Sequence, residues 1–439
     1  MNLKWLILSL LIGALYYHVE AIKWLALSHI PVDQVWNQTR HCPSDKIERK
    51  KHGLVGYQAK FCRRLTDMMP IVMRAARATT YFCQKHFTDR RWNCSSIEYA
   101  PKLRPDLAKG TREQAYAYAL SSASVLHQVA KSCGTGEISY CPCGPRPNDA
   151  EMGFKWEGCS DNTMYGRKVS MEWADAPWRK KRNRRLRKVN RLTPADMSSI
   201  SLDEFMRGAE FLTPRAKMNQ HNNNVGRAIA AQSLETKCKC HGVSSSCSLK
   251  TCWKVLPSLN DISLKLKERY GRATEVRATG KLSANNNRNR NDNNGGGDSA
   301  SHEHFEDSHS AKLMTSEYAV QNPLKRHNTN VQFQQLNGNT KLEFEPVALM
   351  GAVGDTDLVY IRKSPDYCSA DARVGSMGTA GRECNATSTS HNGCDSMCCG
   401  RGYHSVLVEK QENCHCKYVH CCYVKCKTCR YVYKHNYCK

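Results

Sequence analysis

The residues best placed to do chemistry lie in one cysteine-rich segment, residues 237–253, which reads KCKCHGVSSSCSLKTCW. Its cysteines at positions 238, 240, 247 and 252 can nest as an outer pair and an inner pair, and that spacing would staple a hairpin twice. The tip would then hold small side chains in a rigid loop with accessible hydroxyls. An exposed serine of this kind, Ser244 in particular, is a good substrate for a modifying enzyme.

A catalytic role for the same segment is the first alternative. Residues 242–246 (GVSSS) distantly resemble the nucleophile turn of a serine hydrolase, with His241 as the base. The closing glycine is missing, however, and a doubly stapled loop is not the strand-to-helix turn that such a nucleophile needs. Adjacent positions in so small a loop give poor geometry, and nothing supplies an oxyanion hole. We therefore expect no enzymatic activity.

Closely spaced cysteines offer a second alternative, a metal or redox site. Residues 426–429 (CKTC) have the spacing of a redox dithiol, and residues 238–240, 141–143 and 414–416 could belong to zinc knuckles. The compartment decides between these interpretations, because disulfides form in oxidising compartments and thiols persist in reducing ones.

The beginning of the chain indicates export. A basic head at residues 1–4 precedes a mostly apolar stretch at 5–17 and a small-residue cleavage signal at 19–21, as in a secretory signal peptide. The alternative, a buried helix, does not explain why the apolar run stops at such a site. We expect the mature chain to begin at Ile22, and its 24 cysteines to form disulfides rather than bind metal. Three sequons, at Asn37, Asn93 and Asn385, agree with this route.

The charge of the chain predicts acidic partners. Its 439 residues carry a formal net charge of +25. Export argues against nucleic acid and favours sulfated polysaccharide at a cell surface. No later segment has the apolar length of a membrane-spanning helix, so contact with a membrane would need the protein surface or a covalent lipid.

The elements that must position the stapled loop are mainly helical. Helices are expected at residues 55–85, 111–131, 224–236 and 259–270, and Thr111 with Gln114 matches a capping box. After residue 346 cysteines recur every few residues, which predicts short hairpins around 406–408 and 418–424. The predicted fold class is α+β: a mainly helical N-terminal domain with a stapled hairpin, and a cysteine-rich C-terminal domain of short β-hairpins.

Two segments are expected to stay unpacked. Residues 179–191 carry nine Lys or Arg and no acidic residue, and 280–345 contain an Asn- and Gly-rich run. The basic segment is interpreted as a solvated loop or, alternatively, as a site for a basic-specific protease at Arg182 or Arg185.

The expected division is a signal peptide (1–21), an N-terminal domain (22–279) with a basic insert at about 179–215, a linker (280–345) and a C-terminal domain (346–439).

Five motifs in one order resemble signatures of the Wnt family. They are RRWNCSS at 90–96, GTRE at 110–113, the stapled segment at 238–253, MCCGRGY at 397–403 and CHCKYVHCCYVKC at 414–426. Residues 22–27 (IKWLAL) and 364–368 (SPDYC) are most similar to the eleventh subgroup of that family. The resemblance covers nearly all of the mature chain except the basic insert and the linker.

The resemblance implies a secreted, acylated and N-glycosylated ligand that grips the cysteine-rich domain of a Frizzled receptor and acts in developmental patterning, cell polarity or movement. One contact is a thumb, where the acyltransferase Porcupine would attach a monounsaturated fatty acyl group to Ser244. The other is an index finger at the C-terminal hairpin. The implied thumb residues are His241, Gly242, Val243 and Ser244, and the implied finger residues are Tyr418, Val419, His420, Cys421, Cys422, Tyr423 and Val424. Other implied partners are a co-receptor, a lipid-binding carrier during secretion, and heparan sulfate in the extracellular matrix.

Two residues depart from the family pattern. Ser245 stands where the family usually has Gly, which stiffens the tip and offers a rival hydroxyl for acylation. His420 stands where Trp is common, which either removes a large apolar contact with the receptor or makes this an ordinary exposed hairpin residue.

The resemblance also implies a complete set of disulfides. The pairs are Cys83 with Cys94, Cys133 with Cys141, Cys143 with Cys159, Cys238 with Cys252, Cys240 with Cys247, Cys368 with Cys399, Cys384 with Cys394, Cys398 with Cys438, Cys414 with Cys429, Cys416 with Cys426, and Cys421 with Cys422. Cys42 and Cys62 are then left to pair with each other.

Overall fold

The computed structural model describes residues 21–146, 155–178, 213–282, 340–347, 353–420 and 422–439. The predicted signal peptide up to residue 20, the basic insert up to residue 212 with Arg182 and Arg185, most of the predicted linker, and Cys421 lie outside the described residues.

The chain divides into two units. The first comprises Met1–Ala278 and Phe344–Lys439, and the second comprises Thr279–Glu343. Most of the second unit lies outside the described residues, so the division into domains stays a prediction. The contacts described below belong to the first unit.

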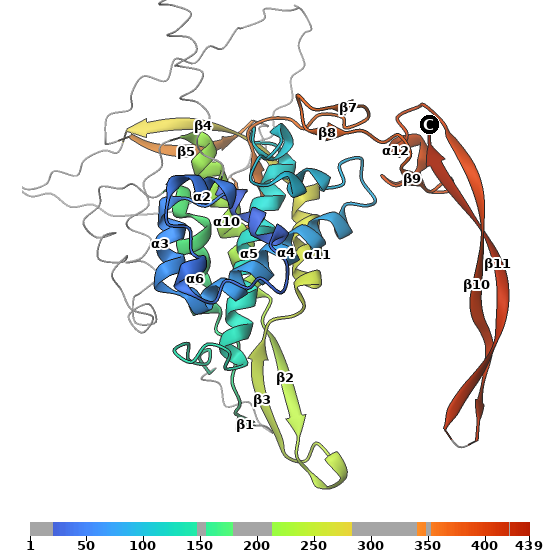
Figure 1. The fold of residues 1–439 in the computed structure, drawn as a ribbon, viewed down its shortest axis with the longest axis horizontal. Helices are drawn as coiled ribbons and strands as arrows, with labels where there is room; N and C mark the ends of the chain where they lie inside the picture. The colour runs from blue at the N-terminus through green and yellow to red at the C-terminus, as the bar shows by residue number, and fades with distance from the viewer. Residues whose placement is uncertain (1–20, 147–154, 179–212, 283–339, 348–352, 421) are drawn as a thin grey trace, which may run out of the picture. The chain divides into compact units, whose positions relative to one another are not determined.

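The helical part is built around α5 (Arg112–Gly134), which packs against α4, α6, α10 and α11 (Figure 1). The other α-helices are α2 (Lys46–Lys51), α3 (Gly56–Arg64), α4 (Met69–His86), α6 (Thr163–Ala174), α10 (Pro214–Gln232), α11 (Leu259–Gly271) and α12 (Cys394–Met397). Short 3₁₀ helices cover Ala21–His29, Thr39–His41, Thr66–Met68, Ser95–Tyr99, Pro105–Leu107, Ala176–Trp178 and Val243–Ser245.

Small residues explain why so many helices can crowd around α5. A Cβ at Gly166 of α6 would lie 2.6 Å from the carbonyl oxygen of Leu126, and a Cβ at Gly226 of α10 would collide with the backbone of Ala119. Glycines at these two crossings let the backbones meet directly. The mixed helical and stranded architecture confirms the predicted α+β fold class.

Two predicted helices differ from the structure. Residues 55–85 form α3 and α4 with a 3₁₀ turn between them, because Pro70 in the first turn of α4 cannot continue a preceding helix. The helix predicted at 224–236 begins at Pro214 and ends at Gln232. Its first half is polar, so apolar spacing missed it, and yet Asn222 there is buried and bonds the backbone of Val359 through both its amide nitrogen and its oxygen, each at 2.9 Å.

The predicted cap of α5 is present in altered form. The hydroxyl of Thr111 accepts a hydrogen bond from the backbone N–H of Gln114 at 3.2 Å, as expected. The side chain of Gln114 reaches back to the N–H of Gly110, at 2.6 Å, and not to that of Thr111.

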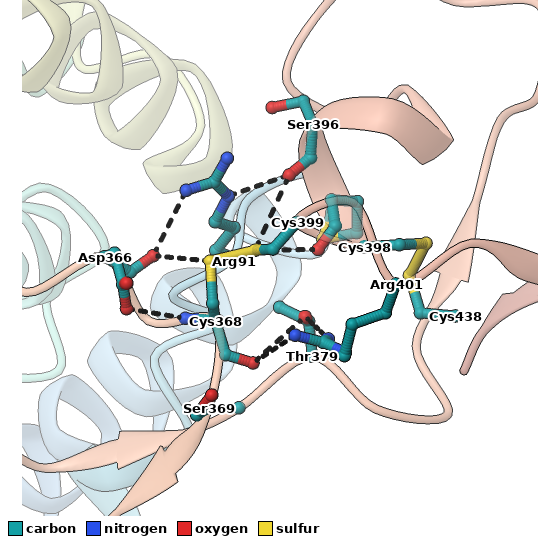
Figure 2. Close-up of a disulfide and its surroundings, with 12 residues drawn as sticks. Arg91, Asp366, Cys368, Ser369, Thr379, Ser396, Cys398, Cys399, Arg401 and Cys438 are labelled. Carbon is teal, nitrogen blue, oxygen red and sulfur yellow. Dashed lines mark hydrogen bonds between the residues drawn. A yellow bond between two sulfur atoms is a disulfide. The ribbon is translucent and has the colours of Figure 1, made fainter.

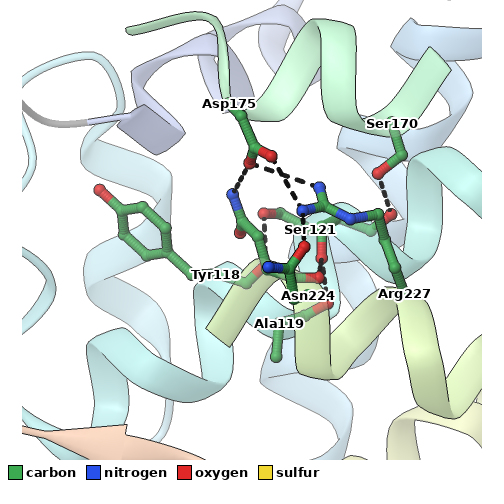
Figure 3. Close-up of polar contacts among 9 residues, drawn as sticks. Tyr118, Ala119, Ser121, Ser170, Asp175, Asn224 and Arg227 are labelled. Atoms are coloured by element: carbon green, nitrogen blue, oxygen red, sulfur yellow. Dashed lines mark hydrogen bonds and ion pairs between the residues drawn. The ribbon is translucent and has the colours of Figure 1, made fainter. Parts of the chain in front are cut away.

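A buried ion pair joins α6 to α10 (Figure 3). Arg227 is fully buried, and its Nη2 lies 2.9 Å from Oδ2 of Asp175, the residue that caps the end of α6. Asn223 donates to Oδ1 of the same carboxylate at 2.8 Å, and Arg227 also donates to the Asn224 side chain at 2.5 Å. The charges are thus compensated by bonds from several directions, as burial requires.

The GTRE motif at 110–113 forms hydrogen bonds that join residues 361–364 to the helical part. The carbonyl of Gly110 accepts hydrogen bonds from the N–H groups of Ile361 and Arg362, at 2.8 and 2.9 Å. Glu113, which is buried, accepts from Tyr270 at 2.9 Å and from Ser364 at 2.6 Å. Two family-like motifs, at 110–113 and 364–368, therefore meet in space.

The strands are short except in one hairpin. They are β1 (Lys155–Trp156), β2 (Glu235–Cys240), β3 (Lys250–Val255), β4 (Thr274–Leu282), β5 (Thr340–Pro346), β6 (Val359–Tyr360), β7 (Ala370–Asp371), β8 (Ser376–Met377), β9 (Glu383–Cys384), β10 (Tyr403–Val419) and β11 (Tyr423–Cys438). The hairpins predicted around 406–408 and 418–424 are parts of one antiparallel ribbon, β10 with β11, and β9 pairs with β11 at its base.

Disulfides replace a large core in the C-terminal part. Its buried cluster consists of Cys384, Cys394, Met397, Cys398 and Cys438. The described residues contain eleven disulfides, Cys42 with Cys62 among them, and all of them join cysteines that were expected to pair. The expected pair of Cys421 and Cys422 includes Cys421, which is outside the described residues.

Arginines complete the packing around the Cys368–Cys399 disulfide (Figure 2). Arg401 donates to the carbonyl of Cys368 at 3.1 Å and to the hydroxyl of Thr379 at 2.6 Å. Arg91, from the helical part, donates to the carbonyl of Ser396 at 2.8 Å. Charge-assisted bonds to backbone carbonyls thus hold segments that bury little apolar surface.

No helix among the described residues is long and apolar enough to cross a bilayer.

Asp106 makes folding stability depend on pH. The carboxylate is fully buried, accepts hydrogen bonds from Trp92 and Ser96, and burial raises its pKa from the usual 3.8 to about 6. The folded protein therefore binds the proton of the Asp106 carboxyl more tightly than the unfolded chain does. The ionised carboxylate lowers the free energy of unfolding above pH 6, and this loss disappears as the pH falls. Lowering the pH from 7.5 to 5 should raise the unfolding free energy by about 1 kcal/mol relative to Asp106→Asn. Chemical denaturation of both proteins at both pH values measures this; an equal pH response would contradict it.

Candidate functional site

The stapled segment forms a hairpin, as its spacing predicted. β2 and β3 pair antiparallel with Cys238 opposite Cys252, and the bridge between these two residues spans 4.1 Å between Cα atoms. The second bridge, Cys240–Cys247, closes the tip. Every cysteine of the CKTC and Cys-X-Cys segments is in a disulfide with a partner outside its own segment, so these thiolates are not available as a redox dithiol or as zinc ligands.

Backbone hydrogen bonds fold the tip tightly. The N–H of His241 donates to the carbonyl of Leu249 at 2.7 Å, that of Gly242 to Ser246 at 2.8 Å, and that of Ser246 to Val243 at 3.1 Å. A Cβ at Gly242 would lie 2.6 Å from the carbonyl oxygen of Ser246. Only glycine fits at this position, so the tip conformation depends on it.

The tip presents the hydroxyl of Ser244 to solvent. Ser244 is exposed, and its side chain has no hydrogen bond to any residue that the structure describes, whereas the hydroxyls of Ser246 and Ser248 pair with each other at 3.1 Å. Val243 and Leu249 are 90% and 60% exposed. The loop therefore combines an accessible acceptor oxygen with apolar side chains that a lipid or an apolar groove would cover.

The tip lacks the arrangement of a hydrolase. Nε2 of His241 lies 2.8 Å from the hydroxyl of Thr251, so the candidate base bonds another residue. A general base must lie within hydrogen-bond reach of its nucleophile, and no such bond joins His241 to Ser244 among the described residues.

The base of the hairpin is fixed to the end of α5. β1 pairs with β3, and the buried side chain of Asp161 accepts a bond from the N–H of Leu256 at 2.7 Å. Lys131 of α5 lies 3.0 Å from Asp161 and donates to the carbonyl of Leu256 at 2.7 Å. His127, whose pKa is lowered by burial, donates to the carbonyl of Pro257 at 2.9 Å. These anchoring residues were missed, because Asp161 and Lys131 are distant in sequence from the stapled segment.

Ser245 adopts a backbone conformation suited to glycine. Its φ is +62°, in the left-handed region that costs a residue with a Cβ about 1 kcal/mol. Ser245→Gly should therefore slow amide hydrogen exchange at Gly242 about two- to fivefold, since the hairpin tip would open less often. Ser245→Ala, which keeps the Cβ, is the matched control. Equal exchange rates in the two variants would contradict this account.

The described finger residues, all of the predicted set except Cys421, lie at the end of the β10–β11 ribbon. Tyr418, Tyr423 and Val424 are 73%, 58% and 59% exposed, and His420 is exposed at the turn. The disulfides Cys414–Cys429 and Cys416–Cys426 cross the ribbon where its register shifts between Cys414 and Lys417. The tip is therefore a stapled platform of aromatic and aliphatic side chains exposed to solvent.

The three sequons differ in exposure. Asn37 and Asn385 are exposed, and Asn93 is half-buried beside the Cys83–Cys94 bridge. Oδ1 of Asn93 accepts a bond from the hydroxyl of Ser95 at 2.7 Å, and that of Asn385 accepts one from Thr387 at 2.8 Å. The amides at Asn37 and Asn385 are accessible for attachment of a glycan in the folded chain.

Comparisons with known proteins agree with the motifs. A model of the "wnt family" matches residues 50–439. Protein Wnt-11 of Gallus gallus is 37% identical over 421 residues, covering 95% of this chain and 93% of that protein. Protein Wnt-11 of Xenopus laevis is 36% identical, with coverages of 96% and 94%. The solved structure of human WLS in complex with WNT8A aligns with a TM-score of 0.48 and 23% identity, over 87% of this chain and 98% of the matched chain.

Proposed function

Because the chain belongs to the Wnt family, whose members are signalling ligands rather than enzymes, we propose that it is a secreted ligand for the cysteine-rich domain of Frizzled receptors. The resemblance noted in the sequence is thereby confirmed over nearly the whole chain. The proposed ligand is acylated on Ser244 and makes its second contact through the finger residues.

The observation that carries this proposal is the exposed hydroxyl of Ser244, which has no hydrogen bond to a described residue, on a doubly stapled loop. Burial of an acyl chain yields about 0.8 kcal/mol per methylene, so one chain in a receptor groove supplies much of a nanomolar affinity. A rigid hairpin delivers that chain at little cost in ordering, because its backbone is already held in place. The exposed Val243 extends the apolar contact.

The remaining parts of the proposal follow the secretory route. Porcupine attaches the acyl group, a lipid-binding carrier takes the ligand to the surface, and glycans occupy sequons such as Asn37 and Asn385. The net charge of +25 retains the ligand on heparan sulfate in the matrix, a contact that weakens with salt. Stronger retention on heparin than on a plain cation exchanger supports the specific interaction.

Mass measurement of one peptide tests the central modification. Trypsin releases residues 240–250 from the reduced protein, because Lys239 and Lys250 flank Ser244. An increment equal to a monounsaturated fatty acyl group, located on Ser244 by fragmentation, supports the proposal. An unmodified peptide from a host with an active acyltransferase refutes the lipid anchor and leaves a matrix protein without a receptor as the second candidate function, which the net charge favours.

A further inference from the structure

We propose that Lys417 and Lys425 form a cationic clasp that binds a carboxylate of the receptor beside its apolar contact with the finger. This inference rests on the proposed function and adds the chemistry of the partner at the second contact. It was not visible in the sequence, because it depends on how β10 and β11 are aligned.

The register of the ribbon brings the two lysines together. Lys417 lies directly opposite Lys425, and Val419 lies directly opposite Tyr423. Residues two apart on a strand point to the same face, so these four side chains share one face of the finger, and Tyr418 with Val424 shares the other. One face thus presents two ammonium groups next to an aliphatic and an aromatic side chain.

The charges of this face are not compensated within the described chain. Like charges directly opposite each other destabilise a hairpin, and both lysines are exposed without an ion pair or hydrogen bond to any described residue. Nearer the base the pattern differs: Lys410 lies 2.6 Å from Glu412, and Arg430 lies 3.4 Å from Glu409. Residues 413–428 contain no Asp or Glu at all. The tip therefore keeps a repulsion that the rest of the ribbon avoids.

An acidic protein surface fits this face better than a sulfated polysaccharide. A carboxylate between two ammonium groups accepts charge-assisted hydrogen bonds from both and removes their mutual repulsion. The neighbouring Val419 and Tyr423 gain nothing from a sulfate chain, but they would pack on the apolar surroundings of a receptor carboxylate. The occupant we assign is thus a carboxylate at the rim of an apolar patch on the receptor domain.

The test uses the secreted, acylated full chain and a purified Frizzled cysteine-rich domain. The variant is Lys417→Gln with Lys425→Gln. The control is Lys434→Gln with Lys439→Gln, which removes the same charge from exposed positions nearer the base of the ribbon. Affinities are measured at low and high salt, together with hydrogen exchange of the β10–β11 amides.

We expect the tip variant to bind about tenfold more weakly with less dependence on salt, and the control to stay within about twofold of the parent. Amide exchange at the tip should slow in the same variant, because a repulsive pair is gone. Weaker binding together with a more stable hairpin is a result that a merely structural role of the lysines would not give.

Other outcomes separate the two levels of the proposal. If the parent binds and the tip variant binds equally well, the clasp is refuted and the proposed function stands. If the tip variant loses retention on heparin but keeps its receptor affinity, the lysines serve sulfated polysaccharide and the clasp is again refuted. If the acylated parent binds no Frizzled domain, the proposed function itself fails.

Discussion

Ser244→Ala should weaken binding to a Frizzled cysteine-rich domain by at least about 100-fold, because it removes the only oxygen to which the acyl group is proposed to attach. Burial of about eight methylenes is worth roughly 6 kcal/mol, or about 10⁴-fold in affinity. The measured loss should be smaller than this, because the finger residues would still contact the receptor. The hairpin itself should survive, since its disulfides and backbone bonds do not use the Ser244 side chain. Surface plasmon resonance with detergent-free protein measures the loss.

Neighbouring hydroxyls provide the controls for this experiment. Ser246→Ala removes a hydroxyl that bonds Ser248, and Ser245→Ala removes the rival acceptor. Both variants should keep the acyl group and bind within about threefold of the parent. If Ser245→Ala loses the acyl group and Ser244→Ala keeps it, the site of acylation is one residue further along than proposed.

The second large effect is expected in the helical part, outside either proposed contact. Arg227→Met should lower the unfolding free energy by about 3–5 kcal/mol, because the Asp175 carboxylate would remain buried without its cation. A loss of this size is a large fraction of the stability of a typical domain, so the secreted yield should fall sharply. Denaturant unfolding of the purified protein, with yield as a second readout, measures the effect.

An exposed ion pair and a double replacement make this result specific. Arg373→Met breaks the pair with Asp371 on the surface, where Arg373 is 90% exposed, and should leave the unfolding free energy close to that of the parent. Replacing Arg227 by Met together with Asp175 by Leu should recover much of the loss, because no charge is left buried. Equal losses of unfolding free energy in the double and single variants would show that the packing lost with the Arg227 side chain, and not the unpaired charge, causes the effect.

The stapled hairpin could be predicted from sequence because its information is local. Four cysteines within fifteen residues leave few ways to pair, and small residues between them form the tip. The disulfides of the C-terminal part could not be derived in this way, since bridges such as Cys398–Cys438 close long segments that spacing alone does not choose. Those pairs required the family resemblance.

Helices with polar buried faces were the main difficulty for the fold. The first half of α10 is polar and was not included in the predicted helix, but its asparagines pair with a strand, a helix end and a glutamine that lie far away in the chain. Apolar periodicity does not detect a face that is buried through hydrogen bonds. The long ribbon was also missed, because its exposed faces carry no simple alternation that marks strand length.

At the candidate site, the two hairpin tips could be predicted from the sequence. The residues that anchor the first tip, and the lysines that face each other near the second, could not. Asp161 and Lys131 meet only through tertiary structure, and the facing of Lys417 and Lys425 depends on a register that follows a bulge. A shift of one residue in that register would send the two lysines to opposite faces.

The buried pair of Arg227 and Asp175 also determines where this ligand tolerates added sequence. The described residues of the helical part stop at Trp178 and resume at Thr213, and the pair holds together the elements on either side of this gap. Doubling the length of a connecting segment costs only about 0.6 kcal/mol in closure entropy when its ends are already fixed. A fluorescent protein or an affinity tag inserted between these points should thus leave both proposed receptor contacts unaltered, and the proposed secreted ligand could be followed between cells.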